Sequence, residues 1–289
     1  MKPLQDHVAV VAGATRGAGR GIAAMLGEAG ATVYCTGRST RSLQSDMQRS
    51  ETIEDTADIV TAYGGVGIPV RVDHTKEEEV KALFNRVRRE QNGRLDILVN
   101  DVWGGDPLTE WGTPFWEHSL AGGLLMQERA VHSHMITSYY GAPLMVARKQ
   151  GLLIEITDGV DYRYRGNLYY SLAKVSAIHL AAVMAEELRS FGVTAVAVTP
   201  GFLRSEAMLE LFGVTKENWK DAVKQDPHFI MSETPMYVGR AIAALAADPN
   251  KMEKTGQSLS SWGLSDEYDF VDEDGNRPHW GNYAAELGL

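Results

Sequence analysis

The sequence contains a single cysteine, Cys35, and therefore cannot form a disulfide bond within the chain. Cys35 lies in an apolar stretch typical of a strand, which favours a buried packing role over a nucleophilic one. Positive charge is also scarce, because 28 Lys and Arg residues are set against 38 Asp and Glu residues, for a net charge of −10. No basic stripe is available to neutralise phosphates, which argues against a nucleic-acid partner.

Long apolar runs are missing as well. No run approaches the roughly 18 residues needed to span a bilayer, and the short polar N-terminus shows no signal peptide. We therefore expect a cytoplasmic protein without a membrane partner. The composition that remains, 44% hydrophobic and 23% charged, is that of an ordinary globular protein. Because no linker or internal repeat is visible, we expect residues 1–289 to form one domain.

The N-terminal part predicts a strand, a glycine-rich turn, a helix and a second strand. Residues 7–12 and 31–36 are short apolar runs of the kind that form buried parallel strands. Glycines in the turn between them let backbone N–H groups and the helix N-terminus approach a pyrophosphate. The unit therefore predicts a dinucleotide site. Its turn supplies candidate cofactor contacts at Gly13, Thr15, Gly17 and Gly19.

The alternation of strands and helices continues along the chain. Further strands are expected near residues 67–72, 95–99, 151–156, 193–198 and 256–260. Helices are expected at 51–63 with Ser50 as its cap, 76–90, 120–147 (one helix or two), 168–188 and 235–247. This order predicts an α/β fold, a doubly wound and mostly parallel sheet of about seven strands with helices on both faces. Residues 202–234 are expected to form a substrate lid, and residues 262–289 an acidic, aromatic extension.

Tyr170 and Lys174 lie four residues apart in the expected helix 168–188 and therefore share one helix face. A free phenol has a pKa near ~10 and is a poor acid or base at neutral pH. An ammonium group beside it favours the phenolate and brings its pKa closer to the working range. Taken alone, the spacing also fits a chance surface pair, so its meaning depends on the motifs around it.

Three motifs in this order resemble the short-chain dehydrogenase/reductase family. Its glycine turn reads Thr-Gly-x-x-x-Gly-x-Gly, with Ala12 here in place of the threonine, and its catalytic pair reads Tyr-x-x-x-Lys. The third motif, Pro-Gly-x-x-x-Thr, matches Pro200 and Gly201, with Ser205 in place of the threonine. The resemblance covers about residues 5–260, and the Asp-x-Asp-Gly-x-Arg-Pro tail indicates one branch of the family.

The resemblance implies a nicotinamide-dependent oxidoreductase acting on a small-molecule substrate. Tyr170 would pass a proton to the substrate oxygen, while Lys174 would lower the pKa of Tyr170 and hold the nicotinamide ribose. Pro200, Gly201 and Ser205 would position the nicotinamide carboxamide. Members of the family usually form dimers or tetramers through helices beside the active site, so we expect a homodimer or homotetramer.

The end of the second expected strand indicates which nicotinamide cofactor is bound. An acidic residue there would bind a ribose 2′-hydroxyl, but the sequence offers Arg38 and Ser39, with Arg16 in the glycine turn. Arginines without a carboxylate favour a 2′-phosphate, so NADP(H) is the preferred cofactor and NAD(H) the alternative. Arg41, in the polar loop 39–50, could add to this site. The competing interpretation is that these arginines are solvated surface residues.

Two polar residues follow other strands. Asp73 follows the third expected strand, where an aspartate of the family hydrogen-bonds the adenine ring. A cap for the helix 76–90, shared with Thr75, is an equal alternative for Asp73. Asn100 is the only residue kept of the family's Asn-Asn-Ala-Gly motif, and we expect it to fix the sheet backbone beside the cofactor.

The family's helper residues are altered. Where it has a serine about a dozen residues before the tyrosine, Thr157 lies 13 and Asp158 lies 12 residues before Tyr170. Thr157 could orient the substrate through its hydroxyl, whereas Asp158 could act if protonated or if the substrate is cationic, or could cap a turn. The family's helix asparagine is missing, and His132 or Glu128 takes its place. A satisfied core histidine is the competing interpretation of His132.

Aromatic residues crowd the loop after the fourth expected strand, where they either line a substrate cleft or pack elsewhere. They are Trp103, Trp111, Phe115 and Trp116. Together with the motifs, they predict NADP(H)-dependent carbonyl reduction, or the reverse alcohol oxidation, on an apolar substrate that could be bulky.

Two alternative functions stay open. The first is an imine or iminium reductase, in which an ionised Asp158 stabilises the cation. The second is a cofactor-binding protein with little turnover. We expect no metal site, because the acidic stretch near Asp272 lacks the later glutamate of a calcium loop and is typical of a turn.

Overall fold

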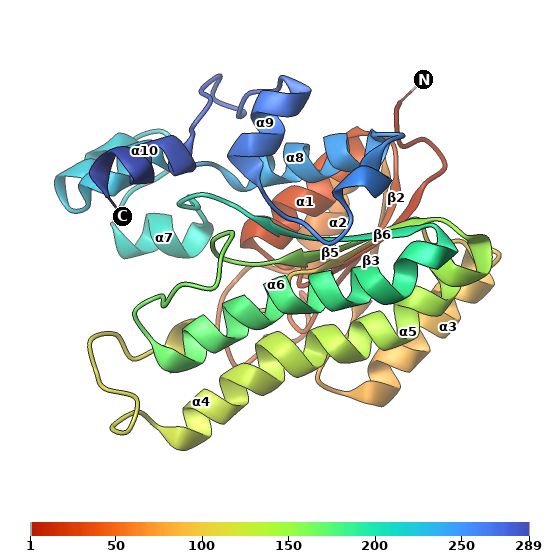
Figure 1. Cartoon of the computed structure of the whole chain (residues 1–289), viewed down its shortest axis with the longest axis horizontal. Helices are drawn as coiled ribbons and strands as arrows, with labels where there is room; N and C mark the ends of the chain where they lie inside the picture. Colours follow the sequence, from red (N-terminus) through yellow and green to blue (C-terminus); the bar gives the residue numbers. More distant parts are fainter. Residues whose placement is uncertain (1, 289) are drawn as a thin grey trace.

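A single parallel sheet forms the centre of the computed structural model, which describes residues 2–288. Its seven strands have the order β3-β2-β1-β4-β5-β6-β7, and helices cover both faces (Figure 1). The strands are β1 Val8–Ala12, β2 Thr32–Gly37, β3 Val66–Arg71, β4 Ile97–Asn100, β5 Gly151–Ile156, β6 Val193–Thr199 and β7 Ser258–Ser260. The doubly wound α/β fold predicted from the sequence is confirmed.

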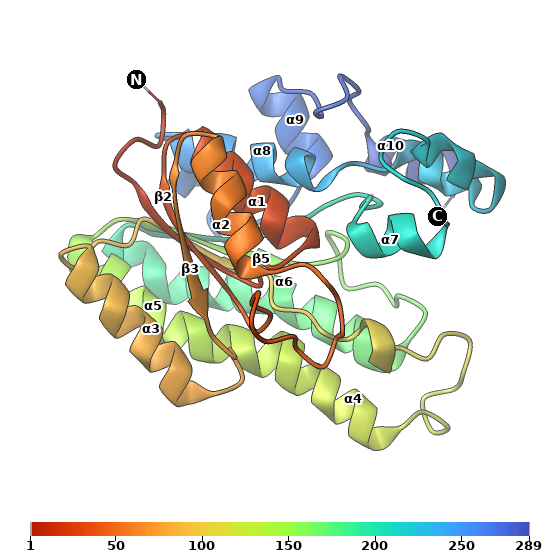
Figure 2. The same ribbon diagram turned by 180° about the vertical axis from the view of Figure 1, so that it is seen from behind.

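The helices divide between the two faces of the sheet, as the two opposite views in Figures 1 and 2 show. Helices α1, α2, α8 and α9 lie on one face, and α3, α5 and α6 on the other. The ten helices of the described part are α1 Gly17–Glu28, α2 Ile53–Ala62, α3 Glu77–Glu90, α4 Leu120–Gln127, α5 Ser133–Arg148, α6 Leu168–Leu188, α7 Glu206–Leu211, α8 Pro235–Ala247, α9 Ser261–Tyr268 and α10 Trp280–Leu287.

Strand order reverses between β1 and β4, because the chain builds outward from β1 to β3 and then returns to the other side of β1. Adjacent crossover connections leave the sheet in opposite directions at such a point. This leaves a crevice at the carboxyl ends of the two strands. The glycine turn after β1 and the loop after β4 both lie at this crevice, so the topology itself brings the predicted cofactor residues together.

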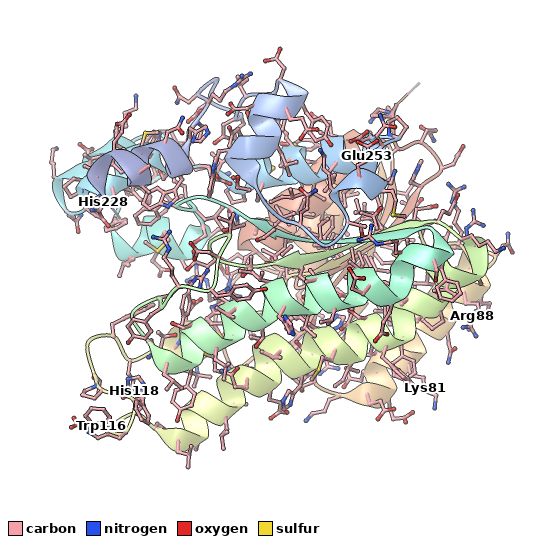
Figure 3. The ribbon with its side chains drawn as sticks, viewed as in Figure 1. Lys81, Arg88, Trp116, His118, His228 and Glu253 are labelled. Carbon is pink, nitrogen blue, oxygen red and sulfur yellow. The ribbon has the colours of Figure 1, made fainter. Side chains whose placement is uncertain are left out.

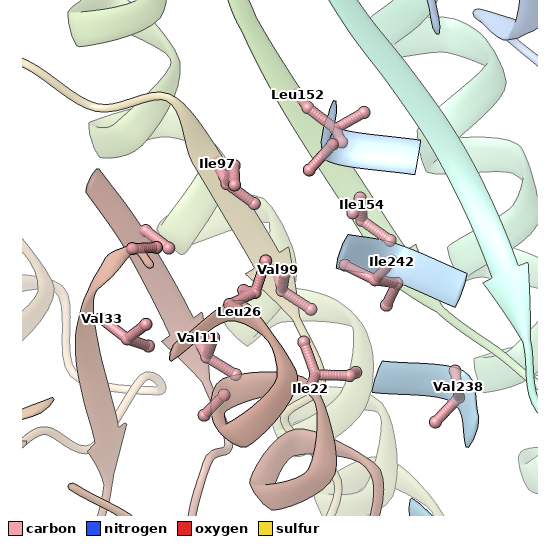
Figure 4. Close-up of a cluster of buried hydrophobic side chains, with 14 of the residues drawn as sticks. Val11, Ile22, Leu26, Val33, Ile97, Val99, Leu152, Ile154, Val238 and Ile242 are labelled. Carbon is pink, nitrogen blue, oxygen red and sulfur yellow. The ribbon is translucent and has the colours of Figure 1, made fainter. Parts of the chain in front are cut away.

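The core on the α1 and α8 face is built from valine, isoleucine and leucine side chains (Figure 4). Its tight packing depends on glycine. A Cβ atom at Gly21 would lie 1.9 Å from the carbonyl oxygen of Pro235, and one at Gly239 would lie 2.4 Å from that of Gly21. The two helix backbones therefore approach more closely than any side chain would allow.

Several predicted boundaries change. Helix α2 begins after Thr52, whose side chain accepts a hydrogen bond from the N–H of Asp55, so Ser50 is not its cap. The expected helix 120–147 is α4 and α5 joined by a π-helical turn, Glu128–His132. Helix α6 agrees with the predicted bounds.

One finding about α6 was not anticipated from the sequence. With the turn after it, Leu168–Phe191 is long and apolar enough to cross a membrane, by length and composition only. Helix α6 instead packs on β5 and β6 of the sheet, as expected for a helix of a layered α/β fold. The cytoplasmic location stays a prediction.

Replacing Gly21 by alanine tests the close approach of α1 and α8. The new Cβ would meet backbone rather than a movable side chain, so we expect Gly21→Ala to lower the free energy of unfolding by about 1–3 kcal/mol or more. Gly122→Ala is the control, because a Cβ there meets only the side chains of Ser119 and Leu108. Urea unfolding measures both. Equal stability of the two variants would contradict the packing account.

Candidate active site

A cavity of about 700 Å³ opens at the carboxyl ends of β1, β2, β4, β5 and β6. Most of the predicted site residues line it: Gly13, Thr15, Arg16, Gly17, Arg38, Ser39, Asp73, Thr157, Asp158, Tyr170, Lys174, Pro200, Gly201 and Ser205. Two predicted residues, Gly19 and Asn100, are not in its wall. The sequence motifs therefore meet at one place.

The glycine turn leaves room for a ligand and presents backbone donors to it. Gly13 and Gly17 have φ angles of +93° and +56°, which favour glycine, and a Cβ at Gly13 would lie 2.4 Å from the carbonyl oxygen of Asp101. The N–H of Gly17, at the start of α1, donates to a carboxylate oxygen of Glu206 at 2.8 Å. This helix N-terminus thus already binds an anionic group, and the residues fit a pyrophosphate.

Positive side chains gather where the ribose of a dinucleotide would lie. Arg38 pairs with Asp46 at 2.7 Å, and the carboxylate of Asp46 also accepts from Arg129, which lines the cavity from the π-helical turn. Asp46 and Arg129 were not singled out from the sequence, since no motif marks them. Arg41 was predicted wrongly: it turns to the surface and pairs with Asp55 and Asp58 at 2.7 and 2.6 Å.

Asp73 lies in the cavity wall but does not cap α3. One of its carboxylate oxygens accepts from the N–H and the hydroxyl of Thr75, at 3.0 and 2.8 Å. The residue before α3 is Lys76, which makes no side-chain capping bond. The capping alternative is therefore wrong, while a contact of Asp73 with adenine stays a prediction.

Asn100 corrects another expectation, because it bonds side chains rather than the sheet backbone. Its Nδ2 donates to the hydroxyl of Ser138 at 2.9 Å and to the carboxylate of Glu155 at 2.7 Å. Glu155 also pairs with His134 at 2.5 Å. Asn100 therefore belongs to a buried polar network behind the cavity rather than to its wall.

Tyr170 lies in the first turn of α6, where the side chain of Asn167 caps the helix by accepting from the N–H of Tyr170 at 3.0 Å. Its hydroxyl donates to a carboxylate oxygen of Asp158 at 2.9 Å. The rings of Trp103 and Trp111 lie 5.4 and 5.3 Å from the tyrosine ring, centroid to centroid. The phenol is thereby fixed by contacts on several sides.

Burial, followed by the charge of Asp158, raises the pKa of Tyr170 well above its ordinary value. The pKa of Tyr170 is therefore not lowered as expected, because burial and the charge of Asp158 outweigh any effect of Lys174. The Nζ of Lys174 lies 4.1 Å from the ring centroid of Trp103 and 5.5 Å from that of Tyr170, and burial lowers the pKa of Lys174. In this state Tyr170 is a neutral phenol, suited to donate a proton rather than to accept one.

Thr157 and Asp158 follow β5 and have different surroundings. Thr157 is buried, and its hydroxyl donates to the backbone carbonyl of Lys174 at 2.7 Å, which ties the end of β5 to α6. The side chain of Asp158 is 50% exposed, and it is the one that meets the hydroxyl of Tyr170. Of the two candidates, only Asp158 forms a hydrogen bond with the hydroxyl of Tyr170 in the described residues.

Neither candidate for the missing helix asparagine lies near Lys174. His132 is exposed, so the core-histidine interpretation is wrong for it too, and Glu128 is half-buried outside the cavity wall. A second cavity of about 10 Å³, close to the room one water molecule needs, lies beside Lys174 instead, with Ala130 and His134 in its wall. The helix position was misjudged because the π-helical turn shifts which residues face inward.

Asp101 was missed, although the departure from the Asn-Asn-Ala-Gly motif falls on it. Its carboxyl accepts from the backbone N–H of Gly19 and lines both cavities. Burial raises the pKa of Asp101 to about 7, although the charges of Lys174 and His134 favour its ionised form.

The aromatic loop is only partly in the site. Trp103 lines the cavity and Trp111 contacts Tyr170, whereas Trp116 is 71% exposed and meets Phe115 edge to face. Figure 3 shows Trp116 at the outer tip of this loop, far from the lid residue His228.

The other aromatic wall comes from the predicted lid and the aromatic C-terminal extension, whose site residues were not singled out individually from the sequence. It consists of Phe202, His228, Trp262 and Trp280. Helix α10, which carries Trp280, lies beside α7 in both ribbon views (Figures 1 and 2).

The acidic stretch of the extension forms a turn that binds the lid. Arg204 pairs with Asp272 and Asp274 at 3.3 and 2.8 Å, and the N–H of Thr234 donates to Asp272 at 2.7 Å. Within residues 2–288, no group of three His, Cys, Asp or Glu side chains could hold a metal ion. The extension is therefore joined to the predicted lid segment by the ion pairs of Arg204, of which the pair with Asp272 is buried.

The sequence matches the family model described as short chain dehydrogenase over residues 7–213. It is 36% identical over 277 residues to dehydrogenase/reductase SDR family member 1 of Mus musculus, and 37% over 282 residues to that of Homo sapiens. Each alignment covers 94% of this chain and 85% of the relative. The branch indicated by the tail motif is confirmed.

Solved structures show the same fold. A short-chain dehydrogenase of Mycobacterium thermoresistibile superimposes with a TM-score of 0.79 at 21% identity, covering 96% of this chain and 92% of that one. A hydroxysteroid dehydrogenase of Escherichia coli superimposes with a TM-score of 0.71 at 24% identity, covering 89% and 96%.

The raised pKa of Asp101 makes a prediction about stability. The folded protein keeps a proton on Asp101 up to about pH 7, whereas the unfolded chain releases it near pH ~4, so stability from this group falls as the pH rises between these values. Asp101→Asn keeps an acceptor for Gly19 but cannot ionise. We expect its free energy of unfolding to fall less between pH 5 and pH 8 than that of the wild type, in urea titrations. Identical pH profiles would contradict the assignment.

Proposed function

The chain belongs to the short-chain dehydrogenase family, and from this membership we propose that it is an NADP(H)-dependent carbonyl reductase that also runs the reverse alcohol oxidation. The family makes it a nicotinamide-dependent oxidoreductase acting on hydroxyl and carbonyl groups. The observation that carries the proposal is the neutral, oriented phenol of Tyr170 in the cavity wall, above the buried Lys174.

The glycine turn, Lys174 and Ser205 would hold a reduced nicotinamide cofactor, which would supply the hydride chemistry when bound. Tyr170 passes its proton to the carbonyl oxygen, which becomes the hydroxyl of the product. Lys174 would hold the nicotinamide ribose, and its ammonium, 5.5 Å from the ring centroid of Tyr170, would favour the phenolate that remains. Pro200, Gly201 and Ser205 hold the carboxamide.

The preference for NADP(H) rests on Arg16, Arg38 and Ser39 in the cavity wall. No carboxylate stands at the end of β2 itself, where one would bind a ribose 2′-hydroxyl. Arg38 instead binds the carboxylate of Asp46 from the following loop, and a 2′-phosphate would take over that role with a larger charge.

Substrate size and assembly follow from the surfaces around the site. Residues 202–234 form the lid, whose aromatic wall with Trp262 and Trp280 suits an apolar substrate, and a bulky one would fit a cavity of about 700 Å³. We also propose a homodimer or homotetramer. The outer faces of α4, α5 and α6 expose Leu124, Met135, Tyr139, Leu172 and Val183.

Imine or iminium reduction is the second candidate function. It is favoured by the position of Asp158, whose carboxylate lies beside the hydroxyl of Tyr170. A neutral carbonyl oxygen needs a hydrogen-bond donor at this place, whereas a carboxylate suits a cation.

Tyr170→Phe tests the main proposal. With the acid removed, NADPH oxidation with ketones should fall by about 10²- to 10⁴-fold, while NADPH binding persists because the ring contacts remain. Turnover over a panel of ketones and aldehydes, with a parallel cofactor titration, gives both values. Near-normal turnover in a folded variant would overturn the assignment. Binding of NADPH without turnover of any substrate by the wild type would support the low-turnover alternative.

Arg38→Ala tests the cofactor preference. It should weaken NADPH binding by about tenfold and leave NADH binding nearly unchanged, because only NADPH carries the 2′-phosphate. Arg41→Ala is the matched control, since it removes a nearby arginine that pairs with Asp55 and Asp58 at the surface. Fluorescence titration measures both cofactors. Equal weakening of NADPH and NADH in Arg38→Ala would show that the arginine does not read the phosphate.

A further inference from the structure

We infer that the substrate carries a positively charged nitrogen at or next to the reacting carbon, and that Asp158 binds this charge. The inference rests on the proposed function in one respect, that Tyr170 is the acid of the site. It goes beyond it by naming the chemical class of the substrate.

Asp158 limits which substrate group can face it. An ionised carboxylate accepts hydrogen bonds and donates none, so it cannot hydrogen-bond a neutral carbonyl oxygen as a serine or threonine hydroxyl would. Thr157 has such a hydroxyl, but it already donates to the backbone carbonyl of Lys174. The group that faces Asp158 must therefore be a donor or a cation.

In the described part of the chain, the hydrogen bond that Asp158 accepts comes from Tyr170. Tyr170 must direct this proton to the substrate oxygen during reduction, and Asp158 then loses its partner. A neutral ketone would offer this carboxylate no hydrogen-bond donor. A cationic substrate would replace the lost interaction at the moment Tyr170 turns to the carbonyl.

Two positive charges lie near Asp158, but neither gives it a hydrogen bond in residues 2–288. The Nε of Arg165 forms a loose ion pair with the carboxylate at 3.9 Å, beyond hydrogen-bond distance. Its two Nη atoms donate to the backbone carbonyls of Arg163 and Asp161 at 2.7 and 2.6 Å. Lys174 is held by the ring of Trp103 at 4.1 Å, and no hydrogen bond joins it to Asp158 in residues 2–288.

The other surroundings of Tyr170 also suit a cation. The ring of Trp111 lies 5.3 Å from that of Tyr170, and an aromatic face attracts positive nitrogen, whereas the ring of Trp103 already holds Lys174. Asp106 adds a second carboxylate, which accepts from the indole N–H of Trp103 at 2.6 Å. Two carboxylates and two indole rings thus lie around the hydroxyl that would give up its proton.

Two substrate types share this chemistry. In an amino ketone, the carbonyl carbon accepts hydride, the C=O π bond breaks, and the oxygen takes the proton of Tyr170 while Asp158 holds the ammonium. In an iminium ion, the C=N carbon accepts hydride and the nitrogen regains its lone pair, so a tertiary amine forms without a proton. The reductant in both is the dihydronicotinamide of the proposed function.

A matched pair of ketones tests the inference. Phenacyltrimethylammonium and 3,3-dimethyl-1-phenylbutan-1-one have the same shape and differ by one charge. The cation also activates its own carbonyl, so a direct comparison of the two ketones is not enough. For each protein, kcat/KM of the charged ketone is divided by kcat/KM of the neutral ketone. The measured quantity is this ratio in the wild type divided by the same ratio in Asp158→Ser. We expect this quotient to be about tenfold or more. Asp158→Asn should behave like Asp158→Ser, and Asp161→Asn, which removes a charge from the same loop, should leave the ratio unchanged.

Binding without turnover gives an independent readout. Benzyltrimethylammonium should quench the tryptophan fluorescence of the wild type. It should bind about tenfold more weakly to Asp158→Ser, and circular dichroism checks that this variant is folded. A quotient near one together with equal binding would overturn the inference. If neither ketone is reduced but binding depends on Asp158, the proposed function fails and the cation site stands.

N-Methyl-3,4-dihydroisoquinolinium separates the two substrate types. Its reduction needs no proton, so Tyr170→Phe should still reduce it if the site takes iminium ions, while the same variant fails on the charged ketone. Reduction of the iminium ion that is lost in Asp158→Ser supports an iminium substrate. If Asp158→Ser reduces the iminium ion as fast as the wild type does, the inference is wrong for iminium substrates.

Discussion

The hydrogen bond from Tyr170 to Asp158 is the interaction on which the chemistry of this site depends. It joins the first turn of α6 to the segment after β5, and the bond from the hydroxyl of Thr157 to the carbonyl of Lys174 joins the same two elements one step deeper. The first bond keeps the phenol neutral and aimed into the cavity. The second bond fixes the position of Lys174 relative to Tyr170. A shift of α6 along the sheet would break both.

The rest of the structure holds this pair against the cofactor site. The topological switch between β1 and β4 provides the crevice, and the close approach of α1 and α8 at Gly21 keeps the glycine turn in place. Glu206 connects the lid to the start of α1, and Arg204 connects the lid to the C-terminal extension. A ligand that displaces Glu206 from Gly17 would therefore also act on the lid.

Most of the fold could be predicted, because buried strands, glycine turns and helical periodicity are local signals. The pair Tyr170 and Lys174 followed from a short spacing in one helix. The errors have a different origin. His132 and Glu128 were considered for the missing asparagine because a π-helical turn changes the inward face of the helix. Arg41 was misplaced because its partners Asp55 and Asp58 belong to another element. The raised pKa of Tyr170 could not be foreseen, because it depends on burial and then on the contact with Asp158 across the active site.

The central claim is that this cavity transfers hydride to a substrate carbon while Tyr170 supplies the proton. Mass spectrometry of the product formed with NADPH deuterated at C4 tests it most directly. With the wild-type protein and a ketone, we expect one deuterium in the product, on the carbon that was the carbonyl carbon. With Tyr170→Phe and the same ketone, we expect no deuterated product. Consumption of NADPH without deuterium in the product, or equal labelling by Tyr170→Phe, would contradict it.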